Sequence, residues 1–175
     1  MRKIALFMMV SLDGYFEGPN HELDWHNVDA EFVDFALEQL AAADTLLFGR
    51  KTYELMAGFW PSEVTKTRDP RTAEKMNGMP KIVFSKTFGK ADWENTRLMK
   101  DLTALPEGNL LMLGSNNLAV GFIEAGLLDE VRIMVNPIAI GRGHSLFIGL
   151  LQKFKLKLTN VREFRSGNVL LTYKR

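Results

Sequence analysis

Short apolar runs that alternate with helix-like segments constrain the fold of this chain more than any other feature of its sequence. Such runs cover residues 4–10, 45–48, 81–84 and 110–113. Each ends directly at a small or polar residue, as strands that are buried on both faces commonly do. Strands alternating with helices predict right-handed crossovers and a largely parallel sheet that is covered by helices on both faces.

Helix signals lie between these runs. Asp29 can cap a helix that continues to about residue 43, because apolar residues then recur at helical spacing. Residues 50–57 predict a second helix directly after Gly49. Asp69 and Pro70 form a cap and first turn for a short helix to about residue 77, and Ser115 precedes another that stops at about residue 126.

The last third of the chain predicts antiparallel strands. Residues 130–135 form a strand that Asn136 and Pro137 stop, and residues 153–174 alternate around a Ser-Gly-Asn turn like a hairpin. We therefore expect residues 1–175 to form one domain. It is predicted to be a three-layer α/β/α sandwich with a mixed, mainly parallel central sheet and an antiparallel hairpin at the carboxyl terminus.

Charge and cysteine content limit the possible partners. A formal charge of +1, with both signs interspersed, gives little support to nucleic-acid binding. The absence of cysteine excludes disulfides, thiolate nucleophiles and cysteine-ligated metals. The apolar run at residues 4–10 breaks too early for a signal peptide, and no run approaches the roughly eighteen residues of a membrane span. We expect a cytoplasmic protein without nucleic-acid or membrane partners.

Three junctions after predicted parallel strands are candidates for a cofactor site. They consist of Gly49, Arg50, Lys51 and Thr52; of Ser85, Lys86 and Thr87; and of Gly114, Ser115, Asn116 and Asn117. Parallel strands bring such junctions to one edge of the sheet, where helix amino-termini can bind a pyrophosphate. The junctions carry basic residues and no acidic residue that could receive a ribose 2′-hydroxyl. This favours NADP over NAD.

Four short motifs resemble the dihydrofolate-reductase-like superfamily in their order along the chain. They are SLDG at 11–14, GRKTYE at 49–54, VFS at 83–85 and LGS at 113–115. The resemblance spans about residues 3–174. It is closest to the reductase domain of riboflavin-biosynthesis deaminase-reductases and its stand-alone bacterial relatives, which NPIAIGRG at 136–143 also resembles.

The resemblance implies a function and roles for residues. It implies an NADPH-dependent reductase, similar to 5-amino-6-(5-phosphoribosylamino)uracil reductase, that is frequently a homodimer. The Gly49–Thr52 turn and Ser85, with Lys86 and Thr87, would hold the adenosine-side phosphates, and residues 114–117 would meet the pyrophosphate. Ser11 would border the cofactor, and Asp13 is the candidate proton donor. The substrate pocket would be lined by Leu12, Gly14, Trp25, Pro137, Gly141 and Gly143.

Several alternatives remain open at this stage. Dihydrofolate reduction requires an inward carboxylate on the first helix, where Glu31 and Asp34 are the candidates, and a third possibility is a dinucleotide-binding module without turnover. Residues 23–39 lack the arginine by which riboflavin-pathway reductases grip a ribose phosphate. His21, His26 and His144 match no familiar ligand spacing, so no metal site is expected. Residues 147–151 are either core or a dimer contact.

Overall fold

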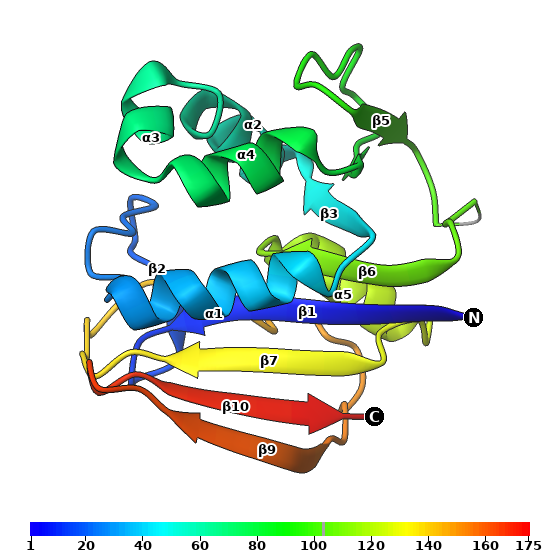
Figure 1. The fold of residues 1–175 in the computed structure, drawn as a ribbon. Helices are drawn as coiled ribbons and strands as arrows, with labels where there is room; N and C mark the ends of the chain where they lie inside the picture. The colour runs from blue at the N-terminus through cyan, green and yellow to red at the C-terminus, as the bar shows by residue number, and fades with distance from the viewer. Residues whose placement is uncertain (103) are drawn as a thin grey trace.

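One mixed sheet of eight strands runs through the molecule (Figure 1). The structure, a computed structural model, describes residues 1–102 and 104–175. The strands are β1 (Arg2–Val10), β3 (Thr45–Gly49), β4 (Lys81–Phe84), β5 (Thr96–Met99), β6 (Gly108–Leu113), β7 (Glu130–Val135), β9 (Lys157–Glu163) and β10 (Val169–Lys174). Their order is β5-β4-β3-β6-β1-β7-β10-β9. All neighbours up to β7 are parallel, whereas β10 is antiparallel to both β7 and β9.

Helices cover both faces of this sheet and complete the predicted three-layer sandwich. They are α1 (Ala30–Ala41), α2 (Arg50–Phe59), α3 (Glu63–Arg68), α4 (Pro70–Gly78) and α5 (Asn116–Glu124). Core residues of α1, α2 and α4 pack on one face, and those of α5 pack on the other. Asp29 caps α1 as expected, because its carboxylate accepts a hydrogen bond of 2.8 Å from the Phe32 amide.

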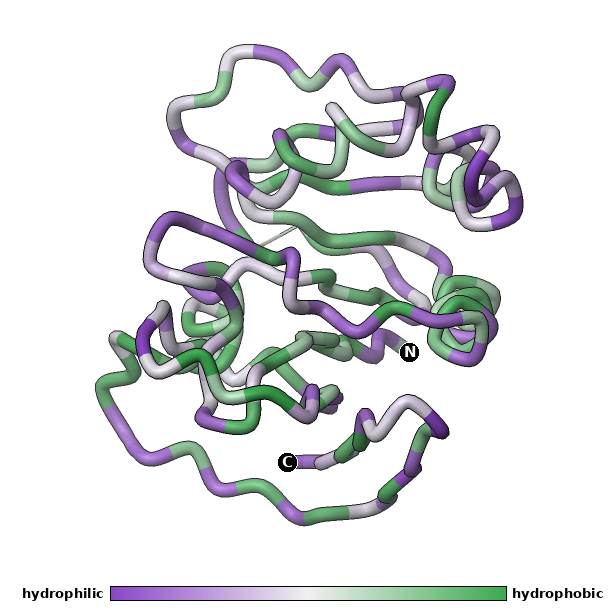
Figure 2. Tube along the Cα trace, turned by 90° about the vertical axis from the view of Figure 1, so that its left-hand side faces the viewer, coloured by the Kyte–Doolittle hydropathy of each residue, from purple (hydrophilic) through white to green (hydrophobic). Residues whose placement is uncertain are grey.

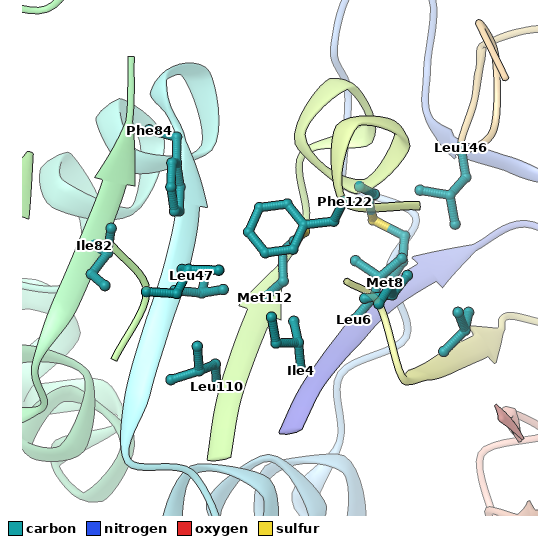
Figure 3. Close-up of a cluster of buried hydrophobic side chains, with 14 of the residues drawn as sticks. Ile4, Leu6, Met8, Leu47, Ile82, Phe84, Leu110, Met112, Phe122 and Leu146 are labelled. Carbon is teal, nitrogen blue, oxygen red and sulfur yellow. The ribbon is translucent and has the colours of Figure 1, made fainter. Parts of the chain in front are cut away.

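The core beneath α5 holds the parallel strands in register (Figure 3). The ring of Phe122 meets that of Phe84 edge to face at 5.6 Å, above the buried side chains of Leu47 and Met112. Apolar stretches follow the central strands, while polar residues concentrate in the connections (Figure 2). This packing fixes the strand ends, and with them the junctions that follow the strands.

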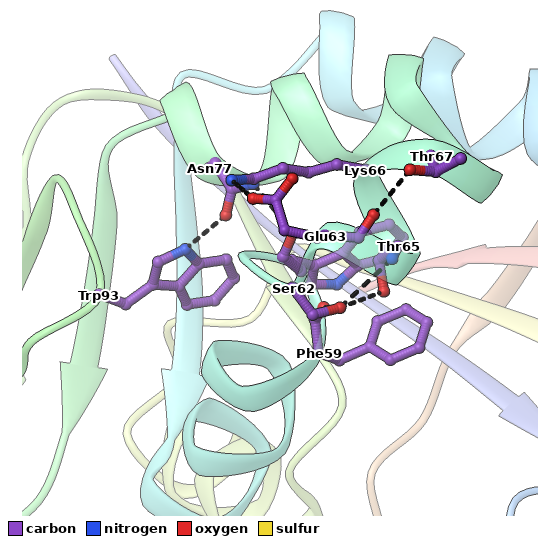
Figure 4. Close-up of polar contacts among 9 residues, drawn as sticks. Phe59, Ser62, Glu63, Thr65, Lys66, Thr67, Asn77 and Trp93 are labelled. Atoms are coloured by element: carbon purple, nitrogen blue, oxygen red, sulfur yellow. Dashed lines mark hydrogen bonds and ion pairs between the residues drawn. The ribbon is translucent and has the colours of Figure 1, made fainter.

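The segment between β3 and β5 contains elements that the sequence did not predict. The six residues of α3 have no apolar face, but Ser62 accepts a hydrogen bond of 3.3 Å from the Thr65 amide and starts the helix (Figure 4). Asn77 of α4 accepts a 2.8 Å bond from the Trp93 indole, which ties α4 to the chain preceding β5. The edge strand β5 was also missed.

A small second sheet lies outside the main one. Strand β2 (Tyr15–Glu17) follows the turn after β1, and β8 (His144–Ser145) follows the loop after β7; the two pair antiparallel. Both therefore begin near the carboxyl edge of the parallel strands. No helix within the described residues has the length and apolar character needed to cross a membrane.

Candidate functional site

The junctions after β3 and β6 meet at the carboxyl edge of the sheet, where these two strands are neighbours. A Cβ atom placed on Gly49 would overlap the hydroxyl of Ser115. A Cβ on Gly114 would lie 3.2 Å from the Thr52 methyl group. The structure therefore brings Gly49 and Thr52 of one junction against Gly114 and Ser115 of the other, as the strand order requires.

The starts of α2 and α5 leave backbone N–H groups without side-chain caps. Gly49 precedes α2 and Ser115 precedes α5, and neither helix start has a side-chain cap bond. Ser115 has a φ of +69° and follows Gly114 at +70°, so two successive residues occupy the left-handed region that turns the chain into α5. Two uncapped helix starts at one edge form an electropositive site suited to an anion.

The third junction uses its hydroxyl locally. Ser85 Oγ accepts hydrogen bonds from the amides of Thr87 (3.3 Å) and Phe88 (3.0 Å), so it caps its own turn. The strand order is β4-β3-β6, so this turn lies at the same sheet edge as the other two junctions. The junction at Gly49 lies between it and Ser115. Lys86 and Thr87 are exposed there. The cationic side chains of Arg50 and Lys51 are exposed at the start of α2, while Asn116 is half-buried and Asn117 exposed at the start of α5.

The Ser11–Gly14 turn links β1 to β2. The buried hydroxyl of Ser11 accepts a 3.0 Å hydrogen bond from the Tyr15 amide, and the Ser11 amide donates to the Tyr15 carbonyl at 2.8 Å. Leu12 is exposed, and its amide donates a 2.7 Å bond to the Ile138 carbonyl. The turn thus contacts the loop after β7. Gly14, at a φ of +87°, closes it.

Asp13 fastens this turn to the loop. Its carboxylate accepts hydrogen bonds from the amides of Ile140 (3.2 Å) and Gly141 (2.7 Å). The pKa of Asp13 is lowered, first by the Ser11 hydroxyl and further by the Gly141 and Ile140 amides, which outweigh the opposing effect of desolvation. An ionised acceptor cannot donate a proton at neutral pH. The geometry therefore supports a positioning role for Asp13 in place of the proton-donor role that we expected.

Replacing Asp13 by alanine should release the loop. We expect amide hydrogen exchange at Ile140 and Gly141 to accelerate by about tenfold, because both N–H groups lose their acceptor. Since the folded-state pKa is lowered, the fastening persists at neutral pH and is lost in the wild type only as the pH falls through this lowered pKa, below the ordinary value of 3.8. Exchange measured by NMR tests this, with Asp24→Ala, an exposed carboxylate elsewhere, as control. Equal protection in Asp13→Ala and wild type would contradict it.

Asn136 is a connecting residue whose importance the sequence did not reveal. It is fully buried at the end of β7, and its amide nitrogen donates to the carbonyls of Val10 (3.0 Å) and Met134 (3.4 Å). Its oxygen accepts a 2.9 Å bond from the Asn27 amide, and Asn168 in turn donates to the Asn27 carbonyl at 2.8 Å. This network joins the ends of β1 and β7 to the chain preceding α1. Its sequence signals are its place directly after a strand and at the start of NPIAIGRG, and neither reveals the hydrogen bonds that it makes.

The remaining predicted pocket residues divide into two groups. Gly143 lies so close to β2 that an added Cβ would be 3.0 Å from the Tyr15 Cβ, and Gly141 is the partner of Asp13. Pro137, which starts the same loop, is exposed. Trp25 is held elsewhere: its indole donates a 3.2 Å bond to the Glu22 carbonyl and packs edge-on against His26. The loop residues therefore meet the Ser11–Gly14 turn, while the described contacts of Trp25 do not join it to them.

Comparison with known proteins places this arrangement in a family. The model of the RibD C-terminal domain matches residues 2–170. The chain belongs to the RibD C-terminal domain family. It is 35% identical to YyaP, an uncharacterized Bacillus subtilis protein, over 98% of this chain and 94% of YyaP. YwjB, a second uncharacterized protein of that organism, is 27% identical over 93% of this chain and 92% of its own length.

Solved structures of RibD-type proteins have the same fold. A protein from Shewanella sp. PV-4, provisionally named a riboflavin biosynthesis protein, superposes with a TM-score of 0.74 at 24% identity and covers 99% of this chain and 98% of its own. A Thermotoga maritima diaminohydroxyphosphoribosylaminopyrimidine deaminase/5-amino-6-(5-phosphoribosylamino)uracil reductase superposes with a TM-score of 0.68 at 15% identity. This chain corresponds to 56% of that longer protein. The predicted fold and the predicted membership of the RibD C-terminal domain family are thus confirmed.

Proposed function

We propose that this protein is an NADPH-dependent reductase of a small heterocyclic or ribosylamino-pyrimidine substrate. The observation that carries the proposal is the contact of Gly49 with Ser115, which places two uncapped helix starts side by side in a member of the RibD C-terminal family. The reaction is suggested by reductases of this family. Its most specific form is the 5-amino-6-(5-phosphoribosylamino)uracil reductase activity that is named for the Thermotoga relative.

The junction residues fit a dinucleotide in shape and charge. Backbone N–H groups at the starts of α2 and α5 would bind the pyrophosphate, because neither start has a side-chain cap, and glycine at position 49 leaves room for the Ser115 hydroxyl beside it. Arg50, Lys51 and Lys86 are exposed cations that would favour a 2′-phosphate, and none of the three junctions carries an acid. Ser85, Thr87, Asn116 and Asn117 would add polar contacts.

The loops after β1 and β7 would hold the substrate. When bound, the nicotinamide supplies the hydride, so the protein has to align the substrate and exclude water. Leu12 and Gly14 belong to the turn, and Pro137, Gly141 and Gly143 to the loop that Asp13 fastens to it. An exposed apolar side chain at Leu12 suits the face of a flat ring. We retain Trp25 as a predicted pocket residue without a described contact to these loops.

Dihydrofolate reduction is less well supported. Asp34 forms an exposed ion pair of 2.7 Å with Arg71, and Glu31 accepts a 2.9 Å bond from the Arg165 amide. Both candidate carboxylates are therefore engaged in other contacts. A binding module without turnover remains the alternative from another class. The homodimer that the resemblance implies, the cytoplasmic location and the lack of nucleic-acid partners stay predictions.

Titration with NADPH and NADH tests the proposal. Energy transfer from tryptophan to the bound nicotinamide should report micromolar NADPH binding, with NADH about tenfold weaker because NADH lacks the 2′-phosphate that the exposed cations would bind. Arg50→Gln should reduce this preference while leaving NADH binding unchanged. Consumption of NADPH with a pterin or ribosylamino-pyrimidine would then separate a reductase from a silent binding module. Failure to bind either dinucleotide would refute the proposal.

A further inference from the structure

Glu17, His21 and His144 form a compact cluster of metal-binding groups outside the dinucleotide site. One ligand atom from each lies within 4.8 Å of the others. Glu17 Oε1 is 2.7 Å from His21 Nδ1 and 3.0 Å from His144 Nδ1. The two imidazole rings stack, with centroids 5.1 Å apart and planes inclined by 19°. Two histidines thus face a single carboxylate oxygen, although they are distant in sequence.

The fold builds this cluster from three backbone features. Pairing of β2 with β8 sets Glu17 opposite His144. The turn after β2 returns His21 to the same place, because the His21 amide donates a 3.0 Å bond to the Gly18 carbonyl and the Gly18 amide donates to Glu22. His21 has a φ of +66°, a left-handed conformation that residues with a Cβ rarely adopt. The backbone therefore holds His21 over Glu17 in a strained position.

We propose that Glu17, His21 and His144 bind one divalent transition-metal ion, with Zn²⁺ as the best match. Imidazole nitrogens and a carboxylate are ligands that zinc accepts, whereas calcium and magnesium prefer oxygen alone. Tetrahedral ligands around zinc are about 3.3 Å apart, given bond lengths of about 2.0 to 2.1 Å. The two contacts of Glu17 are only slightly shorter, so small side-chain rotations admit the ion in place of the imidazole protons.

The exposure of the three side chains provides a route for the ion. Glu17 is 19% exposed at the base of the cluster, and His21 and His144 are 57% and 45% exposed above it. Three protein ligands leave the fourth tetrahedral position to water, as in sites that exchange ligands. His26, five residues after His21, is half-buried, packs edge-on against Trp25 and is not part of the cluster.

Such an ion would act as a clamp between two walls of the predicted substrate pocket. The Ser11–Gly14 turn leads directly into β2, and the loop that Asp13 holds leads directly into β8. The pair β2 and β8 has only two registered residue pairs, so it has few backbone bonds of its own. A metal across Glu17 and His144 would join both strands and the His21 turn. This role is independent of whether the protein binds NADPH.

Zinc binding by tag-free, chelator-treated protein tests the inference. Competition against a chromogenic chelator should give one Zn²⁺ per chain with a micromolar or lower Kd. Glu17→Gln, His21→Gln and His144→Gln should each weaken binding by at least about tenfold, as loss of one ligand predicts. At a hundredfold excess over the wild-type Kd, zinc should raise the melting temperature of the wild type by about 5 °C and that of Glu17→Gln by no more than about half as much.

Two controls make the result decisive. His26→Gln and Glu22→Gln remove a neighbouring histidine and carboxylate that lie outside the cluster, and both should retain wild-type zinc binding. Melting of each variant without metal verifies that it folds. If a histidine variant does not fold, Glu17→Gln still tests the proposal, because glutamine preserves the shape of the glutamate side chain. Absence of zinc binding by the wild type, or equal binding by Glu17→Gln and the wild type, would overturn the proposal.

Discussion

Gly49→Val should weaken NADPH binding by at least a hundredfold while the protein stays folded. Gly49 has a φ of −78° and a ψ of 163°, an extended conformation open to any residue, so the backbone itself tolerates the change. The new side chain instead collides with Ser115 and separates the starts of α2 and α5. Loss of two charge-assisted bonds to phosphate corresponds to about 3 kcal/mol, or at least a hundredfold in Kd. The NADPH titration measures it directly.

Two variants show whether the collision is the cause. Gly49→Ala already meets the Ser115 hydroxyl, and adding Ser115→Gly removes that obstacle, which leaves the Leu118 Cβ at an ordinary 3.7 Å. The double variant should therefore recover much of the lost affinity. Gly58→Ala, in the same helix with nothing within 4 Å, should bind like the wild type. Wild-type affinity in Gly49→Val would show that these helix starts do not hold the dinucleotide.

Much of this architecture follows from local sequence signals, and the exceptions have physical reasons. The buried runs predicted the inner parallel strands because nonpolar residues on both faces exclude an edge position. Asp29 and Pro70 marked helix starts because capping is a short-range interaction. By contrast, α3 has too few residues for a periodic signal, and β5 depends on pairing with β4. Such tertiary dependence leaves no local trace.

The candidate site divides along the same line. The sequence predicted that the junctions at Gly49 and Gly114 lie together, because parallel strands bring the residues that follow them to one edge of the sheet. The role of Asp13 as a fastener depends on the amides of Ile140 and Gly141, whose position only the folded loop defines. The Glu17, His21 and His144 cluster was missed because spacing rules apply to nearby ligands, whereas this one depends on pairing between β2 and β8.

Asn136→Ala should cause the largest loss of stability among changes at the pocket. The side chain is fully buried, so its partners cannot be rehydrated in place. The Asn27 amide loses its acceptor, and the carbonyls of Val10 and Met134 each lose one donor, although Val10 keeps its 2.8 Å bond from the backbone amide of residue 136. Unsatisfied buried groups and the cavity together should lower the unfolding free energy by about 3 kcal/mol, which urea denaturation measures.

The matched control is Asn20→Ala, because Asn20 bonds Glu22 in an exposed loop. It should change the unfolding free energy by less than about 0.5 kcal/mol. If Asn136 also positions the pocket, Asn136→Ala should increase exchange at the Leu12 amide, whose acceptor Ile138 follows Asn136 by two residues. If the unfolding free energy of Asn136→Ala changes as little as that of Asn20→Ala, neighbouring groups replace the hydrogen bonds of Asn136. The ends of β1 and β7 would then be held by the sheet alone.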